Sequence, residues 1–149
     1  LTPMIQRLQS IFLLFASGSC FGLFGTDAAD SDVKLDNSIL FSDASYNVFD
    51  DPVLMGIFGL AGVVFLADIF LFRNRPLQMK LSMLAVALTV TGVAYGAFLY
   101  FTDTAAEISA AVTPDVGLAL PVITLIFGIL ARNYIQKDEK LVRSADRLR

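Results

Sequence analysis

Four long apolar runs, separated by polar segments, dominate the sequence. They cover approximately residues 5–25, 52–72, 79–101 and 115–134. Each is close to the roughly 20 residues that a helix needs to cross about 30 Å of hydrocarbon. No segment alternates apolar and polar residues long enough for a transmembrane barrel, the other fold that satisfies every backbone polar group in lipid. The pattern predicts an all-α, four-transmembrane-helix bundle.

Helix start signals support these limits. Thr2-Pro3, Asp51-Pro52 and Thr113-Pro114 each place a capping oxygen before a proline, whose missing N–H costs nothing at the first helical position. Arg75-Pro76 marks a break before the third run. We therefore expect a single membrane domain over residues 1–149, with outer loops at 26–51 and 102–114 and a polar tail at 135–149.

Composition agrees with a membrane location. The chain is 56% hydrophobic and 17% charged, which is too apolar for the surface of a soluble domain. It contains no histidine, which excludes bis-histidine haem ligation and imidazole zinc sites. Cys20 has no second cysteine to pair with and is interpreted as a small core residue. We expect no cofactor and no metal site.

The basic residues predict the orientation, because cytoplasmic loops of membrane proteins are rich in lysine and arginine. Of the 11 lysines and arginines, only Lys34 falls on the outer side. The prediction is a bacterial inner-membrane protein with both termini in the cytosol. The cations on that side are Arg7, Arg73, Arg75, Lys80, Arg132, Lys137, Lys140, Arg143, Arg147 and Arg149.

The first run is interpreted as a retained helix rather than a cleaved signal. ASGSC at 16–20 is similar to a lipoprotein cleavage box, but Ser17 replaces the usual aliphatic residue and the apolar run continues to Phe24.

The first outer loop is acidic and long. Val33 and Leu35, with Tyr46 and Val48 later, favour a short hairpin. The aspartates do not have the spacing of a calcium-binding EF-hand, so the loop is interpreted as a solvated acidic segment.

Asp68 interrupts the run FLADIFLFRNR at 65–75. It lies about 6 Å from the cytosolic end of its helix, within reach of basic side chains. We expect it to anchor that end of the bundle by an ion pair with Arg73, Arg75, Lys80 or Arg132. The alternative is a proton or ion relay, although the other helices supply no ionisable group near the midplane.

Small residues and one proline also mark the helices. Gly18 with Gly22, and Gly92 with Gly96, form GxxxG pairs that permit close helix packing, within the bundle or against another subunit. Pro121 removes the hydrogen bond to the Gly117 carbonyl and is predicted to kink the fourth helix.

The tail is predicted to continue the fourth helix as an amphipathic extension. Glu139 and Arg143 are spaced for an i, i+4 pair. The apolar stripe needs a partner, which is the bilayer interface, the end of the bundle or another protein. Its members are Leu141, Val142, Ala145 and Leu148.

The two ends of the chain, MIQRLQSIFLLFA from Met4 and KDEKLVRSADRLR from Lys137, resemble those of a four-helix membrane family of Bacteroidota that is a domain of unknown function. Leu1-Thr2-Pro3 precedes the family's usual start. The resemblance implies the same topology and an inner-membrane location, and it transfers no catalytic residue.

The sequence has no nucleophile–base arrangement, phosphate-binding loop or metal-ligand cluster. We therefore expect a non-catalytic subunit or accessory factor that contacts membrane lipids and other integral membrane subunits, and no nucleic acid. The alternative is a small oligomeric transporter or channel that uses Asp68 and a kink at Pro121. A third hypothesis is a lipid or quinone site near Tyr95 and Tyr100.

Overall fold

The computed structural model describes residues 2–31, 45–71, 73–102, 112–114 and 116–147. Helices dominate this part of the chain, so the all-α fold class is confirmed. The helices are α1 (Thr2–Gly22), α2 (Pro52–Ile69), α3 (Arg75–Thr102) and α4 (Leu120–Arg147). Between them lie the strands β1 (Ala29–Ser31), β2 (Ser45–Tyr46) and β3 (Val112–Pro114), and the short 3-10 helices η1 (Leu23–Gly25), η2 (Val48–Asp50) and η4 (Val116–Leu118).

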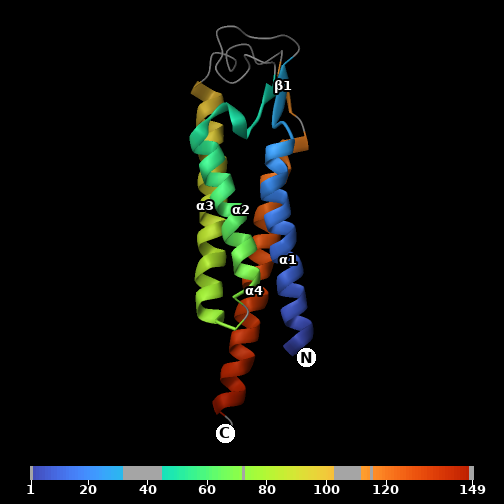
Figure 1. Ribbon diagram of the computed structural model, residues 1–149, viewed down its shortest axis with the longest axis vertical. Coiled ribbons are helices and arrows are strands. Elements are labelled where there is room, and N and C mark those ends of the chain that lie inside the picture. Colours follow the sequence, from blue (N-terminus) through green and yellow to red (C-terminus); the bar gives the residue numbers. More distant parts are fainter. Residues whose placement is uncertain (1, 32–44, 72, 103–111, 115, 148–149) are drawn as a thin grey trace.

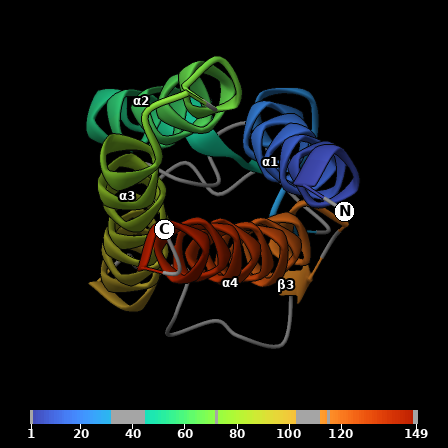
Figure 2. The same ribbon diagram turned by 90° about the horizontal axis from the view of Figure 1, so that it is seen from below.

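The four helices form an up-down-up-down bundle (Figure 1). Each helix packs against its neighbours in sequence, and α4 closes the ring against α1, as the view along the bundle shows (Figure 2). Both chain ends lie at the same end of the bundle as the connection between α2 and α3. We call this the turn end, and we call the opposite end, which carries the strands, the cap end.

Buried residues recur at alternating steps of three and four along every helix. This is the spacing that lets side chains of neighbouring helices interlock at a small crossing angle. The series are Gln9, Leu13, Ala16, Cys20 and Leu23 from α1 into η1; Leu54, Phe58, Ala61, Phe65 and Asp68 in α2; Gln78, Ser82, Ala85, Thr89 and Gly92 in α3; and Thr124, Gly128, Ala131, Ile135 and Asp138 in α4.

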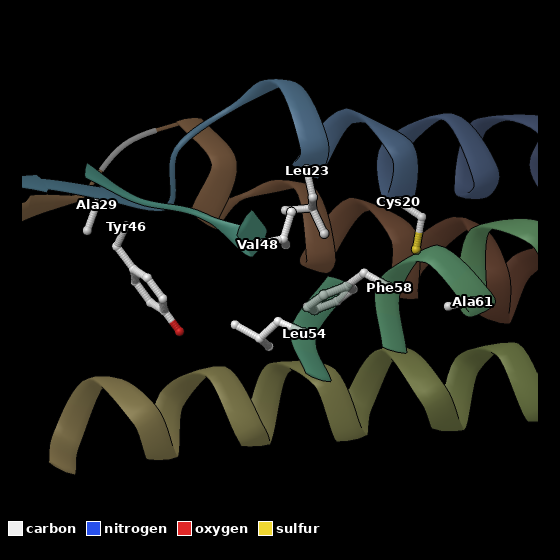
Figure 3. Close-up of a cluster of buried hydrophobic side chains, with 8 residues drawn as sticks. All are labelled: Cys20, Leu23, Ala29, Tyr46, Val48, Leu54, Phe58 and Ala61. Atoms are coloured by element: carbon white, nitrogen blue, oxygen red, sulfur yellow. The ribbon is translucent and has the colours of Figure 1, made fainter. Parts of the chain in front are cut away.

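A small sheet of order β2-β1-β3 joins the two connections at the cap end. Strands β1 and β2 lie between α1 and α2, and β3 lies between α3 and α4. Ala29 of β1 pairs with Tyr46 of β2 and with Pro114 of β3. Tyr46 is buried, and its hydroxyl donates to the Gly96 carbonyl of α3 at 2.8 Å. This side chain belongs to the cap-end apolar cluster (Figure 3). Of the predicted hairpin, Tyr46 is in a strand, whereas Val33 and Leu35 lie outside the described residues.

Helix starts follow the sequence signals at α2. The Asp51 carboxylate accepts hydrogen bonds from the backbone of Val53 at 2.8 Å and Leu54 at 3.4 Å, and Pro52 is the first helical residue. The Asp51 side chain thus satisfies backbone N–H groups in the first turn of α2 that have no partner inside the helix.

The fourth helix begins later than predicted. Thr113-Pro114 lies in β3 instead of starting a helix, and α4 starts at Leu120. The kink predicted at Pro121 is wrong, because Pro121 is the second residue of α4, where its N–H would have no helical partner anyway. Gly117 lies before the helix, in η4, and its N–H donates to the Asp27 carbonyl at 2.9 Å.

Three helical segments of the described chain are long and apolar enough to cross a membrane. They are Arg7–Gly25, Pro52–Ile69 and Arg75–Thr102. Helix α4 is not among them, since Arg132 follows Ala131 only twelve residues into the helix. The predicted fourth span at 115–134 is therefore not among the candidate spans, and α4 is more polar than the other three helices.

Candidate functional site at the turn end

Core positions become polar at the turn end of the bundle. Among the residues whose burial is described, Gln9, Asp68, Gln78 and Asp138 are the buried core residues nearest the turn end, one from each helix, and each is at most 2% exposed. Together with Arg75 they form what we call the turn-end cluster. Bundle interiors are normally filled with apolar side chains at such positions, so this group needs a physical explanation.

Three hydrogen bonds hold the turn-end cluster together. The Gln78 side-chain amide donates to the Asp68 backbone carbonyl at 3.0 Å. The Gln9 amide crosses from α1 to the Tyr134 carbonyl of α4 at 3.1 Å. Arg75 Nε donates to Asp138 Oδ2 at 2.7 Å, which forms an ion pair between α3 and α4. These contacts fix the relative heights of all four helices at this end.

Several buried atoms of this region have no hydrogen-bond partner among the described residues. They are both carboxylate oxygens of Asp68, Gln78 Oε1, Asp138 Oδ1 and Arg132 Nε. Asp68 is 0% exposed and lies in the last turn of α2, where the negative end of the helix dipole disfavours an anion. A buried polar group without a partner costs about 1–3 kcal/mol, and a charged one more. The Asp68 carboxylate is therefore in an unfavourable environment for an anion.

The predicted ion pair of Asp68 is wrong. Arg75 instead binds Asp138, and Arg132 Nε remains without a partner in the described part of the chain. Arg73 and Lys80 are exposed on the outside of the bundle. The reason is geometric: Asp68 follows Phe65 by three residues and so continues the inward-facing stripe of α2.

A second polar group lies halfway along the interior. The Cys20 thiol lies beside the side chains of Thr89 and Thr124. Thr89 also donates to the Ala85 carbonyl at 2.9 Å, and Thr124 donates to the Leu120 carbonyl at 3.0 Å. Each threonine thus bonds to the backbone of its own helix, as threonines inside helices commonly do.

Layers that are apolar apart from Ser17 and Ser82 separate the two polar groups. Leu13, Ala16, Phe65, Ala85 and Ala131 are all fully buried between them. Among the described residues, Asp68 and Asp138 are the buried charged side chains, and both lie at the turn end. The described interior therefore concentrates its carboxylate groups at one end.

The four predicted packing glycines lie in different surroundings. A Cβ atom added at Gly92 would lie 2.7 Å from the Phe58 ring, one at Gly22 would lie 3.2 Å from Leu120, and one at Gly96 would lie 3.2 Å from the Tyr46 hydroxyl. A Cβ atom at Gly18 would meet nothing within 4 Å. Three of the four thus lie at contacts within the bundle, while Gly18 faces outward.

Helix α4 continues past the turn end as a single extension (Figure 1). The expected pair forms between Arg143 and Glu139, at 3.0 Å. Leu141 is 52% exposed, Ala145 is exposed and Val142 is half-buried. Leu148, the fourth member of the predicted stripe, lies outside the described residues.

The described residues contain no group of three or more histidine, cysteine, aspartate or glutamate side chains placed to hold a metal ion. The model of a family described as a domain of unknown function, DUF4293, matches residues 5–148 of the chain. No curated protein and no solved structure matches the chain.

Proposed function

We propose that this chain, which belongs to the DUF4293 family, a domain of unknown function, is a non-catalytic subunit or accessory factor of a larger membrane assembly. The proposal includes a bacterial inner-membrane location, with the turn end and both termini in the cytosol. The excess of basic residues at the turn end supports this orientation.

One observation carries the proposal. The core series of α4, which runs through Ala131, Ile135 and Asp138, continues with the same steps of four and three to Val142 and Ala145. Those two residues lie on the extension, beyond the Arg75–Asp138 pair that marks the start of α3. A helix that keeps its packing register beyond its own bundle presents a seam for another helix.

The partner is proposed to be another integral membrane subunit. The exposed Leu141 lies beside the seam on one flank of the extension, and the Glu139–Arg143 pair lies on the other flank. A partner helix would cover the apolar side and leave the charged side in water. No step of this role requires a catalytic residue.

Purification in a mild detergent tests the proposal. The chain is expected to return with companions in fixed stoichiometry, and migration as a lone monomer would contradict it. Val142→Glu should release the companions, because it places a charge on the seam. Ser144→Glu is the matched control: it adds the same charge to an exposed residue two positions along, about 200° around the helix.

A second candidate, a small oligomeric transporter or channel, is favoured by one observation. Asp68 is fully buried without a partner in the described chain, as ion-coupling carboxylates in membrane proteins can be. Ion or substrate flux into proteoliposomes that contain only the purified chain, abolished by Asp68→Asn, would support this function over the first. Absence of flux with a companion subunit present would argue against it.

A further inference from the structure

We propose that a groove on the outer side of α4 binds the headgroup of an anionic phospholipid. The groove has a volume of about 340 Å³. Its lining residues recur along one side of the helix and are Leu130, Asn133, Tyr134, Gln136, Lys137 and Lys140. They are distinct from the core series of α4 and from the seam of the extension.

The lining changes from apolar to cationic along the helix, and a phospholipid changes in the same order, from its acyl chains to its charged headgroup. Leu130 is apolar, Asn133 and Tyr134 offer an amide and a phenol, and Lys137 and Lys140 end the groove with two ammonium groups. The ten helical steps from Leu130 to Lys140 span about 15 Å. An acyl chain beside Leu130 would thus place its phosphate near hydrogen-bond donors and cations.

The two lysines are not neutralised by an acid in the described chain. The neighbouring acids have other partners, because Asp138 binds Arg75 inside the bundle and Glu139 binds Arg143 on the extension. Lys137 Nζ lies 5.2 Å from the centre of the Tyr134 ring, and this contact holds the ammonium group over the groove. The groove therefore carries two uncompensated positive charges.

The depth of the groove suits a lipid headgroup. The Arg75–Asp138 pair sets the beginning of α3 level with Asp138, so Lys137 and Lys140 lie at the level where the apolar span of α3 begins. In the membrane placement proposed above, on which this inference rests, that level is the cytosolic edge of the hydrocarbon. A free phosphate ion would bind the lysines but would leave the apolar end at Leu130 without a contact, so a lipid fits the groove better.

Thermal unfolding of the full chain in a neutral detergent tests the inference. Unfolding can be followed with a thiol-reactive dye, because Cys20 is the sole cysteine and is buried. Phosphatidylglycerol is expected to raise the unfolding temperature more than phosphatidylcholine with the same acyl chains. Lys137→Gln/Lys140→Gln should weaken the apparent affinity for phosphatidylglycerol about 30-fold, at about 1 kcal/mol for each charge.

The control variant removes the same net charge elsewhere. Lys80→Gln/Arg147→Gln changes two exposed cations outside the groove and should leave the preference for phosphatidylglycerol intact. Equal loss in both double variants, or no lipid preference in the wild type, would overturn the inference. Equal stabilisation by inorganic phosphate would also overturn it, since the site would then bind a free anion.

The test of lipid binding and the test of the proposed function can fail independently. The lipid measurement uses the isolated chain, whereas the proposed function is tested by the companions that purify with it. Lipid preference without companions would remove only the subunit role, and companions without lipid preference would remove only the groove.

Discussion

Replacement of Asp68 by asparagine is expected to stabilise the protein, although it alters a fully buried side chain. Both carboxylate oxygens of Asp68 have no hydrogen-bond partner in the described chain, and the residue lies at the unfavourable end of the α2 dipole. Asparagine has nearly the same shape and no charge. Its amide group also supplies a donor for the nearby Gln78 Oε1, which has no partner either.

The expected gain in stability equals the free-energy cost of burying the unpartnered carboxylate, which Asp68→Asn removes. A buried polar group without a partner costs about 1–3 kcal/mol. We expect the free energy of unfolding of Asp68→Asn to rise by about that amount. For a chain of 149 residues this raises the unfolding temperature by about 2–10 °C.

Asp138→Asn is the matched control, because it makes the same chemical change at the other buried acid of the turn-end cluster. Asp138 is 1% exposed and accepts from Arg75 at 2.7 Å, and the Arg75 side chain is 21% exposed. A hydrogen bond to a charged group contributes about 1.5–3 kcal/mol, so this variant is expected to lose about that much stability. The same substitution should thus have opposite signs at two neighbouring sites.

Both variants can be measured by thermal unfolding in detergent, with dye labelling of Cys20 as the signal. Destabilisation by Asp68→Asn, as large as that by Asp138→Asn, would refute the reasoning. It would mean that the Asp68 carboxylate makes a favourable interaction in the folded protein. A triple comparison with Asp68→Leu separates charge from hydrogen bonding, because leucine removes the charge and supplies no donor.

Three further predictions use contacts elsewhere in the bundle. Gly92→Ala should lower the free energy of unfolding by about 1–3 kcal/mol, because its Cβ atom would overlap the Phe58 ring, whereas Gly18→Ala, with open space, should be neutral or slightly stabilising. Tyr46→Phe should cost about 0.5–1.5 kcal/mol, since it removes a 2.8 Å hydrogen bond to a carbonyl of α3; unchanged stability would mean that the cap does not support the bundle. Cys20 should react with a maleimide only after unfolding, as mass spectrometry can check, and rapid labelling of the native protein would contradict its burial.

The helices could be predicted from the sequence because apolar runs of this length have few alternatives. Their inward faces could also be found, since the steps of three and four that end at Asp68 and at Asp138 are visible in the order of residues. The same spacing places Asp138 on the inward face of α4, although it was not among the residues predicted to matter. It also places Asp68 inside the bundle, away from the exposed cations that its charge alone suggested.

The start of α4 could not be predicted from local pattern. Val116 and Leu118 are apolar and extend the fourth run, but they belong to a 3-10 helix that follows strand β3. That strand pairs with β1, whose residues lie some eighty positions earlier in the chain. Apolar composition does not distinguish a membrane helix from a short segment held by such a distant partner.

Helix α4 is the helix of the bundle that is not apolar enough to be a candidate membrane span, and both proposals concern it. The Gln9–Tyr134 hydrogen bond sets Arg132 level with the part of α1 where Ile11 is 45% exposed and apolar. At that depth α4 carries the half-buried Arg132, whose Nε has no partner in the described chain, and the exposed Asn133, and hydrocarbon would offer their donors no acceptor. A lipid headgroup drawn toward the groove, or a polar surface of a partner subunit, would supply the missing acceptors. The two proposals thus place two contacts on one helix: lipid at the groove on the outer side of α4, and a partner subunit at the seam of Val142 and Ala145.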